Sequence, residues 1–113
     1  MTETLVKVAA VQMVSSHEPE RNMAVAGELI AEAVQKGARL VGLPEYFCLM
    51  GMRDTDKVAI READGHGPIQ DFLSRTAARH GIWLIGGTMP LESADAGRVR
   101  NASLVYEIGR AHV

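Results

Sequence analysis

Glu45 and Cys48 lie three positions apart in the stretch LVGLPEYFCLMG, residues 40–51, and are residue types that form a general base and a nucleophile. In such a pair the carboxylate takes the thiol proton and the thiolate attacks a carbonyl carbon. A reactive cysteine needs an accessible, electropositive setting, and nothing in the flanking residues indicates one. We therefore interpret Cys48, the chain's only cysteine, as a small buried side chain. On composition alone, Glu45 is most simply a solvated loop residue.

Four side chains and one glycine near this glutamate are weaker candidates. Tyr46 and Phe47 could line a pocket, but aromatic residues after a strand more often pack under the loop that follows. The same interpretation applies to Met50 and Met52. Gly86 could let the backbone approach a substrate, although a turn or bulge is the commoner reason for a glycine pair. We keep Gly86 only as a weak candidate.

The histidines give no support for a metal site. His17, His66 and His80 are scattered, without the spacing of a helical metal site and without a cysteine cluster to join them. The glycine-rich stretch DGHGP, residues 64–68, lacks both the spacing and the lysine of a phosphate loop. This stretch is typical of a turn that precedes a helix.

The elements that must position Glu45 follow from the apolar pattern. Residues 5–13, LVKVAAVQM, are almost continuously apolar, which predicts a strand covered on both faces. After SSHEPER, residues 15–21, apolar positions at three- and four-residue steps beginning with Met23 predict an amphipathic helix that ends near a glycine cap at Gly37. The next apolar run, ARLVGL, stops at Pro44, which cannot donate to a sheet ladder. Glu45 is therefore expected just past a strand.

The second half of the chain continues the alternation of strands and helices. Residues 48–67 are polar and predict a loop with a short helical turn, and Pro68 then begins a helix that Gly81 ends. IWLIGG predicts a third strand, MPLESADAGRVR a hairpin-like connection, and NASLVY a fourth strand. This order favours an α/β fold in which helices cover a largely parallel or mixed sheet. In such sheets ligands meet the carboxyl ends of the strands, which is where Glu45 is expected.

Composition limits the classes of protein that fit. The 113 residues are 47% hydrophobic and 23% charged, as in a soluble globular domain. A formal charge of −2 with scattered arginines gives no support for nucleic-acid binding. The apolar runs are shorter than the roughly 20 residues of a membrane span, and the start lacks the pattern of a signal peptide. With one cysteine, the chain is expected in the cytoplasm.

Several segments occur in an order that resembles a known family. These are KVAAVQM, a helix containing Asn22, GARLVGLPEYF, and later DKVAIREADGHGPIQDFLSRTAARHGIWLIGGTMPL and RVRNASLVY. Over nearly its whole length the chain resembles the carbon–nitrogen hydrolases of the nitrilase superfamily, and the later segments are most similar to amidases of the Nit1 and Nit2 type. One such amidase acts on deaminated glutathione.

The resemblance implies a fold and a mechanism. The fold would be the N-terminal part of an α-β-β-α sandwich, and the activity would be hydrolysis of a small carboxamide by a Glu, Lys and Cys triad. It implies no metal or organic cofactor, and a homo-oligomer for the full-length protein. Glu45, in the PE dipeptide, would be the general base, and we expect it in a partly dry pocket near its strand end.

The resemblance also implies that the other two triad members lie outside this chain. In the family the lysine follows the NASLVY-type strand and the cysteine comes later still. The only lysines here, Lys7, Lys36 and Lys57, all precede that strand. We therefore interpret the chain as an inactive N-terminal fragment, and the spacing of Glu45 and Cys48 as a coincidence.

The last residues suggest a separate hypothesis about the boundary of the domain. IGRAHV is what ATC GGA AGA GCA CAC GTC encodes, and this string resembles a common sequencing adapter. We expect residues 1–106 to be a partial carbon–nitrogen hydrolase domain and residues 107–113 to be a non-native tail.

Two alternatives remain open at this stage. One is a small cysteine hydrolase in which Cys48 works with His66 or His80, while Glu45 orients the base. The other is a non-catalytic, truncated paralogue that docks on an intact subunit through its sheet edge. An incomplete sandwich would leave apolar sheet surface uncovered, which favours association.

Overall fold

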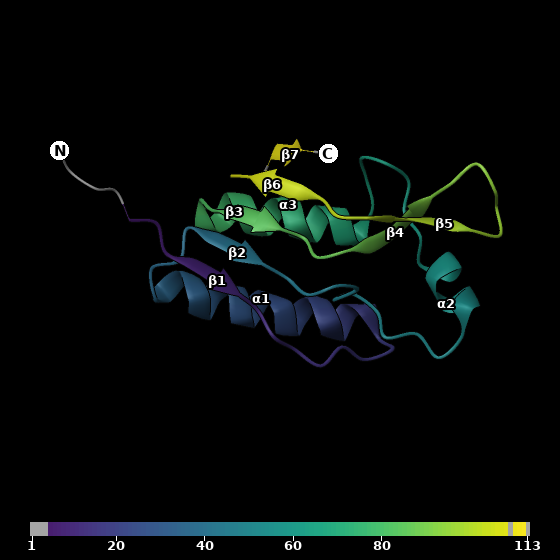
Figure 1. Cartoon of the computed structure of the whole chain (residues 1–113), viewed down its shortest axis with the longest axis horizontal. Coiled ribbons are helices and arrows are strands. Elements are labelled where there is room, and N and C mark those ends of the chain that lie inside the picture. The colour runs from purple at the N-terminus through teal and green to yellow at the C-terminus, as the bar shows by residue number, and fades with distance from the viewer. Residues whose placement is uncertain (1–4, 109, 113) are drawn as a thin grey trace.

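A five-stranded mixed sheet with two long helices on one face forms the body of the protein (Figure 1). The computed structural model describes residues 5–108 and 110–112. The strands of this sheet lie in the order β1-β2-β3-β6-β7, and β4 and β5 form a separate two-stranded sheet. The elements are β1 (Val8–Ala10), α1 (Pro19–Gln35), β2 (Leu40–Gly42), α2 (Asp54–Ala59), α3 (Pro68–His80), β3 (Trp83–Ile85), β4 (Met89–Glu92), β5 (Val99–Ala102), β6 (Val105–Glu107) and β7 (Arg110–His112).

The helix boundaries follow the predicted stop signals. Helix α3 begins at Pro68, where a missing N–H costs nothing, and ends at a left-handed Gly81 with φ of 63°. Gly37 likewise has φ of 96° just after α1. The start of α1 was predicted slightly too late, after Arg21. The helix begins at Pro19, because a proline in the first turn is compatible with the helix whatever the apolar pattern does there.

A buried carboxylate anchors the start of α3. Glu62 is only 6% exposed, and its oxygens accept the backbone N–H groups of Ile69 at 2.6 Å and Gln70 at 3.1 Å. These donors have no partner inside the helix, and the helix dipole favours a negative charge there. Gly67, with φ of 147°, passes so close that a Cβ atom would overlap the Glu62 carboxylate. The backbone of Glu62 also bonds to β4, which ties α3 to the β4–β5 hairpin.

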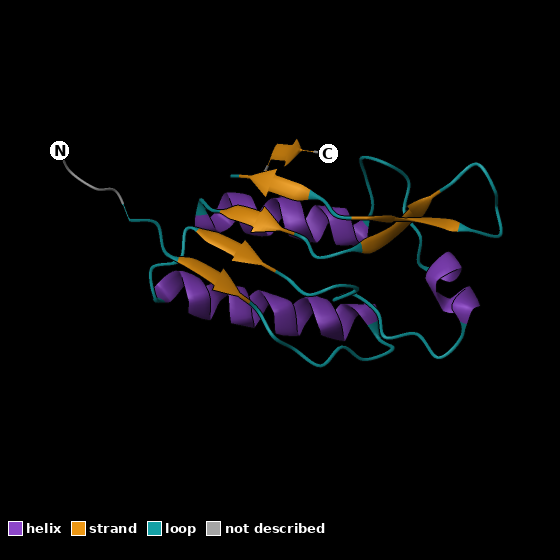
Figure 2. Cartoon of the chain, viewed as in Figure 1, coloured by secondary structure: helices purple, strands orange, loops and turns teal. Residues whose placement is uncertain are grey.

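One face of the large sheet packs on the helices. Strands β1, β2 and β3 are parallel, whereas β6 and β7 pair antiparallel, so the expected mixed α/β fold is confirmed. One residue from each of β1, β2, β3 and β6 lies in a row across the sheet, and each belongs to the buried core or packs against it: Ala9, Val41, Leu84 and Tyr106. Figure 2 shows the two long helices behind these strands.

The opposite face of the same sheet is open, contrary to the prediction of strands covered on both sides. Val8 is 62% exposed and Trp83 is 41% exposed, although both are apolar. They lie in one register row with Leu40 between them. A continuous apolar run shows that both faces of a strand are suited to burial. In the described part of the chain, however, a helical layer covers only one face of the sheet. The uncovered apolar surface agrees with the expectation for an incomplete sandwich.

Two strand assignments need correction. The regular part of β1 covers only Val8–Ala10, not residues 5–13. The predicted NASLVY strand is divided, because Asn101 and Ala102 end β5 while β6 begins at Val105. The chain leaves the small sheet there and enters the large one, and the carbonyl of Leu104 accepts the Gly86 N–H at 2.8 Å at the crossing. The hairpin-like connection before it is a true hairpin of β4 and β5.

The described residues of the segment 107–113 take part in the fold, but this does not test where the segment comes from. Strand β7 pairs with β6 through backbone hydrogen bonds, which any residue other than proline can make. Gly109 and Val113 lie outside the described residues, and the adapter hypothesis stays a prediction. In the described part of the chain, no helix has both the length and the apolar character needed to cross a bilayer.

Candidate active site

Glu45 stands on a turn at the carboxyl end of the parallel strands. It follows the end of β2 by three residues, and the turn begins after the Leu43 N–H donates to the carbonyl of Ile85 at 2.9 Å. Because β1, β2 and β3 run in the same direction, the loops that follow all three meet at this edge. The predicted location of Glu45 past the second strand is therefore confirmed.

Neighbouring loops hold this turn in place from two sides. The backbone N–H of Tyr46 donates to Thr88 Oγ1 at 2.9 Å, which joins the turn to the connection between β3 and β4. On the other side Ser15 Oγ donates to the carbonyl of Phe47 at 2.8 Å. Tyr46 has a positive φ of 47°, unusual for a residue with a side chain. These bonds fix the backbone on both sides of a strained residue directly after Glu45.

A buried amide completes the anchoring. Asn22 of α1 is 2% exposed. Its Oδ1 accepts the Ser16 N–H at 2.7 Å, and its Nδ2 donates to the carbonyls of Ser16 and Cys48, both at 2.8 Å. Asn22 thus links the loop after β1 to the end of the turn that carries Glu45. The sequence pointed to Asn22 only as part of a resemblance, and no local pattern predicts these partners.

Glu45 lines a hollow of about 390 Å³ beside the turn. The hollow combines one acidic, two basic and several apolar or aromatic residues: Glu45, Tyr46, Leu49, Met50, Gly51, Met52, Arg53 and Lys57. Glu45 is exposed, so the expectation of a partly dry pocket is wrong for this chain, in which none of the described residues covers that side. A solvated carboxylate at the rim can accept a proton from any donor brought to it.

Lys57 lies close to the same turn. Its Nζ is 4.1 Å from the centroid of the Tyr46 ring, a cation–π contact. Burial is the main cause that raises the pKa of the Tyr46 phenol, and the charges of Cys48 and Glu45 act in the same direction. Sequence reasoning placed Lys57 in a loop and gave it no role. Its place in the hollow depends on the packing of α2, which no periodic apolar pattern in the sequence predicts.

Cys48 has the features of a core residue, as interpreted from the sequence. Its side chain is 0% exposed, and burial is the main cause that raises the pKa of the thiol to about 12. A nucleophilic cysteine needs the opposite shift and an accessible sulfur. These properties oppose the alternative in which Cys48 and a histidine form a small hydrolase site.

The weaker candidates divide between the hollow and the core. Met50 and Met52 line the hollow and are 62% and 87% exposed, so the interpretation that they pack under the loop is wrong. Phe47 is fully buried, as expected for an aromatic residue under a loop. Gly86 has a packing reason, because a Cβ there would lie 2.7 Å from Leu73 Cδ1. Among the described residues, no group of three or more potential metal-binding side chains occurs.

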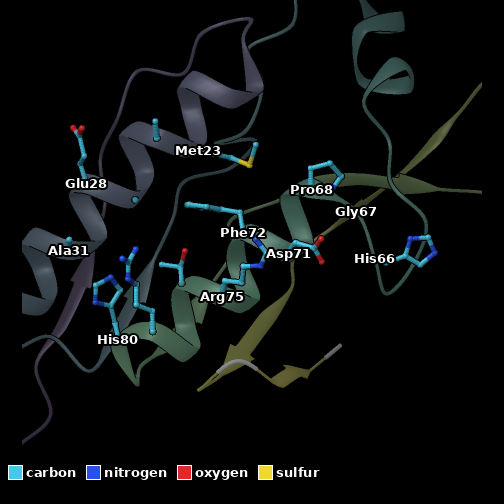
Figure 3. A pocket seen from close by; sticks show the side chains of 14 residues that line it. Met23, Glu28, Ala31, His66, Gly67, Pro68, Asp71, Phe72, Arg75 and His80 are labelled. Carbon is cyan, nitrogen blue, oxygen red and sulfur yellow. The ribbon is translucent and has the colours of Figure 1, made fainter.

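A larger hollow elsewhere does not contain Glu45. A groove of about 1240 Å³ lies between α1 and α3, and its lining includes Met23, Phe72 and Arg75 (Figure 3). Both helices contribute to it on the side of the helical layer. The turn that carries Glu45 and the start of α2, with Arg53 and Lys57, form the smaller hollow. Size alone therefore does not locate the reactive groups.

Comparisons with known proteins add a family and its relatives. The family model described as "Carbon-nitrogen hydrolase" matches residues 7–110. "Deaminated glutathione amidase" of Synechocystis sp. is 34% identical over 110 residues, which cover 92% of this chain and 40% of that protein. "Omega-amidase NIT2-A" of Xenopus laevis is 36% identical over 100 residues, which cover 88% of this chain and 35% of that protein.

A solved structure agrees with these relatives in fold. The crystal structure of Saccharomyces cerevisiae Nit3, described as a member of branch 10 of the nitrilase superfamily, matches with a TM-score of 0.80 at 26% identity. The match covers 93% of this chain and 41% of that one. The chain thus spans about two fifths or less of the length of these relatives.

Proposed function

Because the chain belongs to the carbon–nitrogen hydrolase family, we propose that the complete protein is an amidase that hydrolyses the carbon–nitrogen bond of a small carboxamide. The observation that carries the proposal is the placement of Glu45. Its carboxylate stands at the carboxyl ends of three parallel strands, on a turn fixed by Thr88 and Ser15. It lines a hollow whose open side has room for residues from the rest of the complete protein.

Glu45 acts as the general base in this proposal. It accepts the proton of a cysteine thiol contributed from outside the described residues, and the thiolate attacks the amide carbon. A lysine ammonium from the same source stabilises the oxyanion. Glu45 then returns the proton to the leaving nitrogen, so that ammonia departs and a thioester remains. For hydrolysis of the thioester Glu45 takes a proton from water, whose oxygen attacks the carbonyl carbon. The carbon–sulfur bond then breaks and Glu45 returns the proton to the sulfur, so that the acid and the free thiol are released.

The finer features of the proposal come from the relatives. The names of two of them, a deaminated glutathione amidase and an omega-amidase, support a substrate of the deaminated-glutathione or ω-amide type. We propose that no metal or organic cofactor takes part, that the full-length protein is a homo-oligomer, and that it works in the cytoplasm. The 113-residue chain alone would be inactive, because Glu45 would lack its nucleophile.

The test is release of ammonia by the complete protein expressed from the full coding sequence. We expect Glu45→Gln to lower kcat by at least about a hundredfold, since a positioned general base contributes roughly 10²–10⁴. Glu28→Gln, at an exposed position of α1, is the matched control and should leave kcat unchanged. Full activity of the Glu45→Gln variant would refute the assignment of the base.

One observation favours a second candidate, the non-catalytic module. The open apolar face of the sheet, with Val8 62% exposed, could dock on an intact subunit. Size-exclusion chromatography of the 113-residue chain separates the two. A well-folded, defined oligomer would favour the docking module, whereas precipitation of the chain would support a fragment that needs the remainder of its fold.

A further inference from the structure

The hollow beside Glu45 carries more positive than negative charge. Its three charged lining residues are Glu45, Arg53 and Lys57, one anion and two cations. Asp56 lies on the same helix, but it is not a lining residue, and its carboxylate accepts the backbone N–H groups of Met52 at 2.8 Å and Arg53 at 3.0 Å. Those two bonds are the largest causes that lower the pKa of Asp56. The charge of Arg53 acts in the same direction, so Asp56 partly offsets Arg53, whereas Lys57 is not among these causes and is the lining cation best suited to an anionic ligand.

The ammonium of Lys57 is held at a definite place in this hollow. It lies 4.1 Å from the centroid of the Tyr46 ring, and the Tyr46 backbone is fixed by Thr88 Oγ1. A ring face attracts the ammonium without accepting all of its N–H donors, so that an oxygen ligand can still bind them. Arg53 adds a planar fork of donors that matches a carboxylate.

The remaining walls suit a short hydrocarbon chain. Leu49, Met50 and Met52 also line the hollow. Methionine side chains adapt readily to such ligands. A ligand with an amide at one end, a few methylene groups and an anion at the other would find a carboxylate, apolar walls and cations in the same hollow.

We infer that Lys57 and Arg53 are specificity-determining residues, which select amides that carry a free carboxylate a few carbons from the amide. The inference rests on the proposed amidase function and identifies the groups that would read the second end of the substrate. It treats the two cations as binding groups only, and no bond is made or broken at them.

The experiment compares two substrates on the complete protein. Glutaramate carries a carboxylate, and pentanamide carries a methyl group in its place. We expect Lys57→Met to lower the ratio of kcat/KM for glutaramate to that for pentanamide about tenfold, the value of one charge-assisted contact. The loss should appear in KM for glutaramate, with kcat retained. Lys57→Arg should restore most of the ratio, and Arg53→Met should lower it in the same way as Lys57→Met.

A second readout does not depend on turnover. Glutarate should inhibit pentanamide hydrolysis competitively, and its inhibition constant should rise about tenfold in Lys57→Met. Lys36→Met is the matched control, because this exposed lysine lies at the far end of α1 and pairs with Glu32. It should change neither the ratio nor the inhibition constant.

The two proposals fail in different ways. If Glu45→Gln abolishes hydrolysis but Lys57→Met leaves both the ratio and the glutarate inhibition unchanged, only the selection of a carboxylate is refuted. Equal losses on both substrates would also refute it, since they would indicate a structural role. If the complete protein hydrolyses neither amide, or if Glu45→Gln keeps full activity, the proposed function fails and this inference fails with it.

Discussion

Replacing Asn22 by alanine should both destabilise the protein and disturb Glu45. The side chain is 2% exposed and makes four hydrogen bonds of 2.7 to 3.2 Å, three of them with Ser16 and one with the Cys48 carbonyl. Alanine removes all four. Water can reach the half-buried Ser16, but the carbonyl of fully buried Cys48 would lose its donor with no access to solvent.

The magnitude follows from these bonds. A hydrogen bond contributes about 1 kcal/mol net, and a buried acceptor left unpaired costs about 1–3 kcal/mol. Since three of the four bonds lie where water can partly replace them, we expect a loss of about 3 kcal/mol in the free energy of unfolding. This is a large part of the roughly 5–15 kcal/mol that stabilises a typical domain. The turn should shift with the Cys48 carbonyl and lower kcat.

Urea denaturation of the complete protein measures the first effect, and ammonia release measures the second. Asn101→Ala is the matched control, because Asn101 is an exposed residue of β5. Asn22→Asp keeps the acceptor for Ser16 but replaces the donor that faces Cys48, so it should cost about as much as alanine. A loss below about 1 kcal/mol in both Asn22 variants would refute the reasoning.

Four further predictions follow from other features of the chain. Gly67→Ala should destabilise the protein by about 3 kcal/mol, because φ is 147° and a Cβ would overlap the Glu62 carboxylate; thermal unfolding measures it, with Gly97→Ala as control, and equal effects would contradict it. Cys48, with a pKa raised by burial from 9.0 to about 12, should resist iodoacetamide near pH 8 until urea unfolds the protein. Alkylation of Cys48 in the folded protein would contradict this. The same shift in pKa means that the free energy of unfolding falls as pH rises from 9 towards 12, since only the unfolded thiol ionises there, and Cys48→Ala should flatten this slope. Long-read sequencing of the locus should reveal that different codons follow residue 106 or so, and that they encode a lysine and, later, a cysteine between two strands. An intact gene that ends in the codons for residues 107–113 would refute the adapter hypothesis.

Local signals in the sequence predicted the parts of the fold that local chemistry decides. Pro68 and Gly81 bounded α3 correctly, because a proline lacks one N–H and a glycine adopts positive φ whatever surrounds them. The run NASLVY was taken for one strand, since nothing local marks Ser103 and Leu104 as the crossing between two sheets. The apolar runs also did not predict which face of the strands is covered by helices.

The site divides in the same way. The location of Glu45 past β2 follows from Pro44, which ends the strand. The bonds that hold its turn join residues 26 to 42 positions apart, such as Asn22 to Cys48 and Tyr46 to Thr88. Such pairs exist only once the sheet has assembled, so no spacing along the chain predicts them. Lys57 reaches the hollow for the same reason.

The open face of the sheet and the open side of the hollow belong to one structural problem. Val8, Leu40 and Trp83 form an apolar row across three strands, and the strands of that row lead into the loops around Glu45. This row contains the first residue of each strand, so a layer that covers the face from the row to the carboxyl ends of the strands would reach the hollow and remove water from it. Burial of apolar surface, at about 25 cal/mol per Å², would then supply the free energy that dries the base. On the proposed function, completing the core and assembling the triad are therefore a single event, and a chain that lacks that layer lacks both.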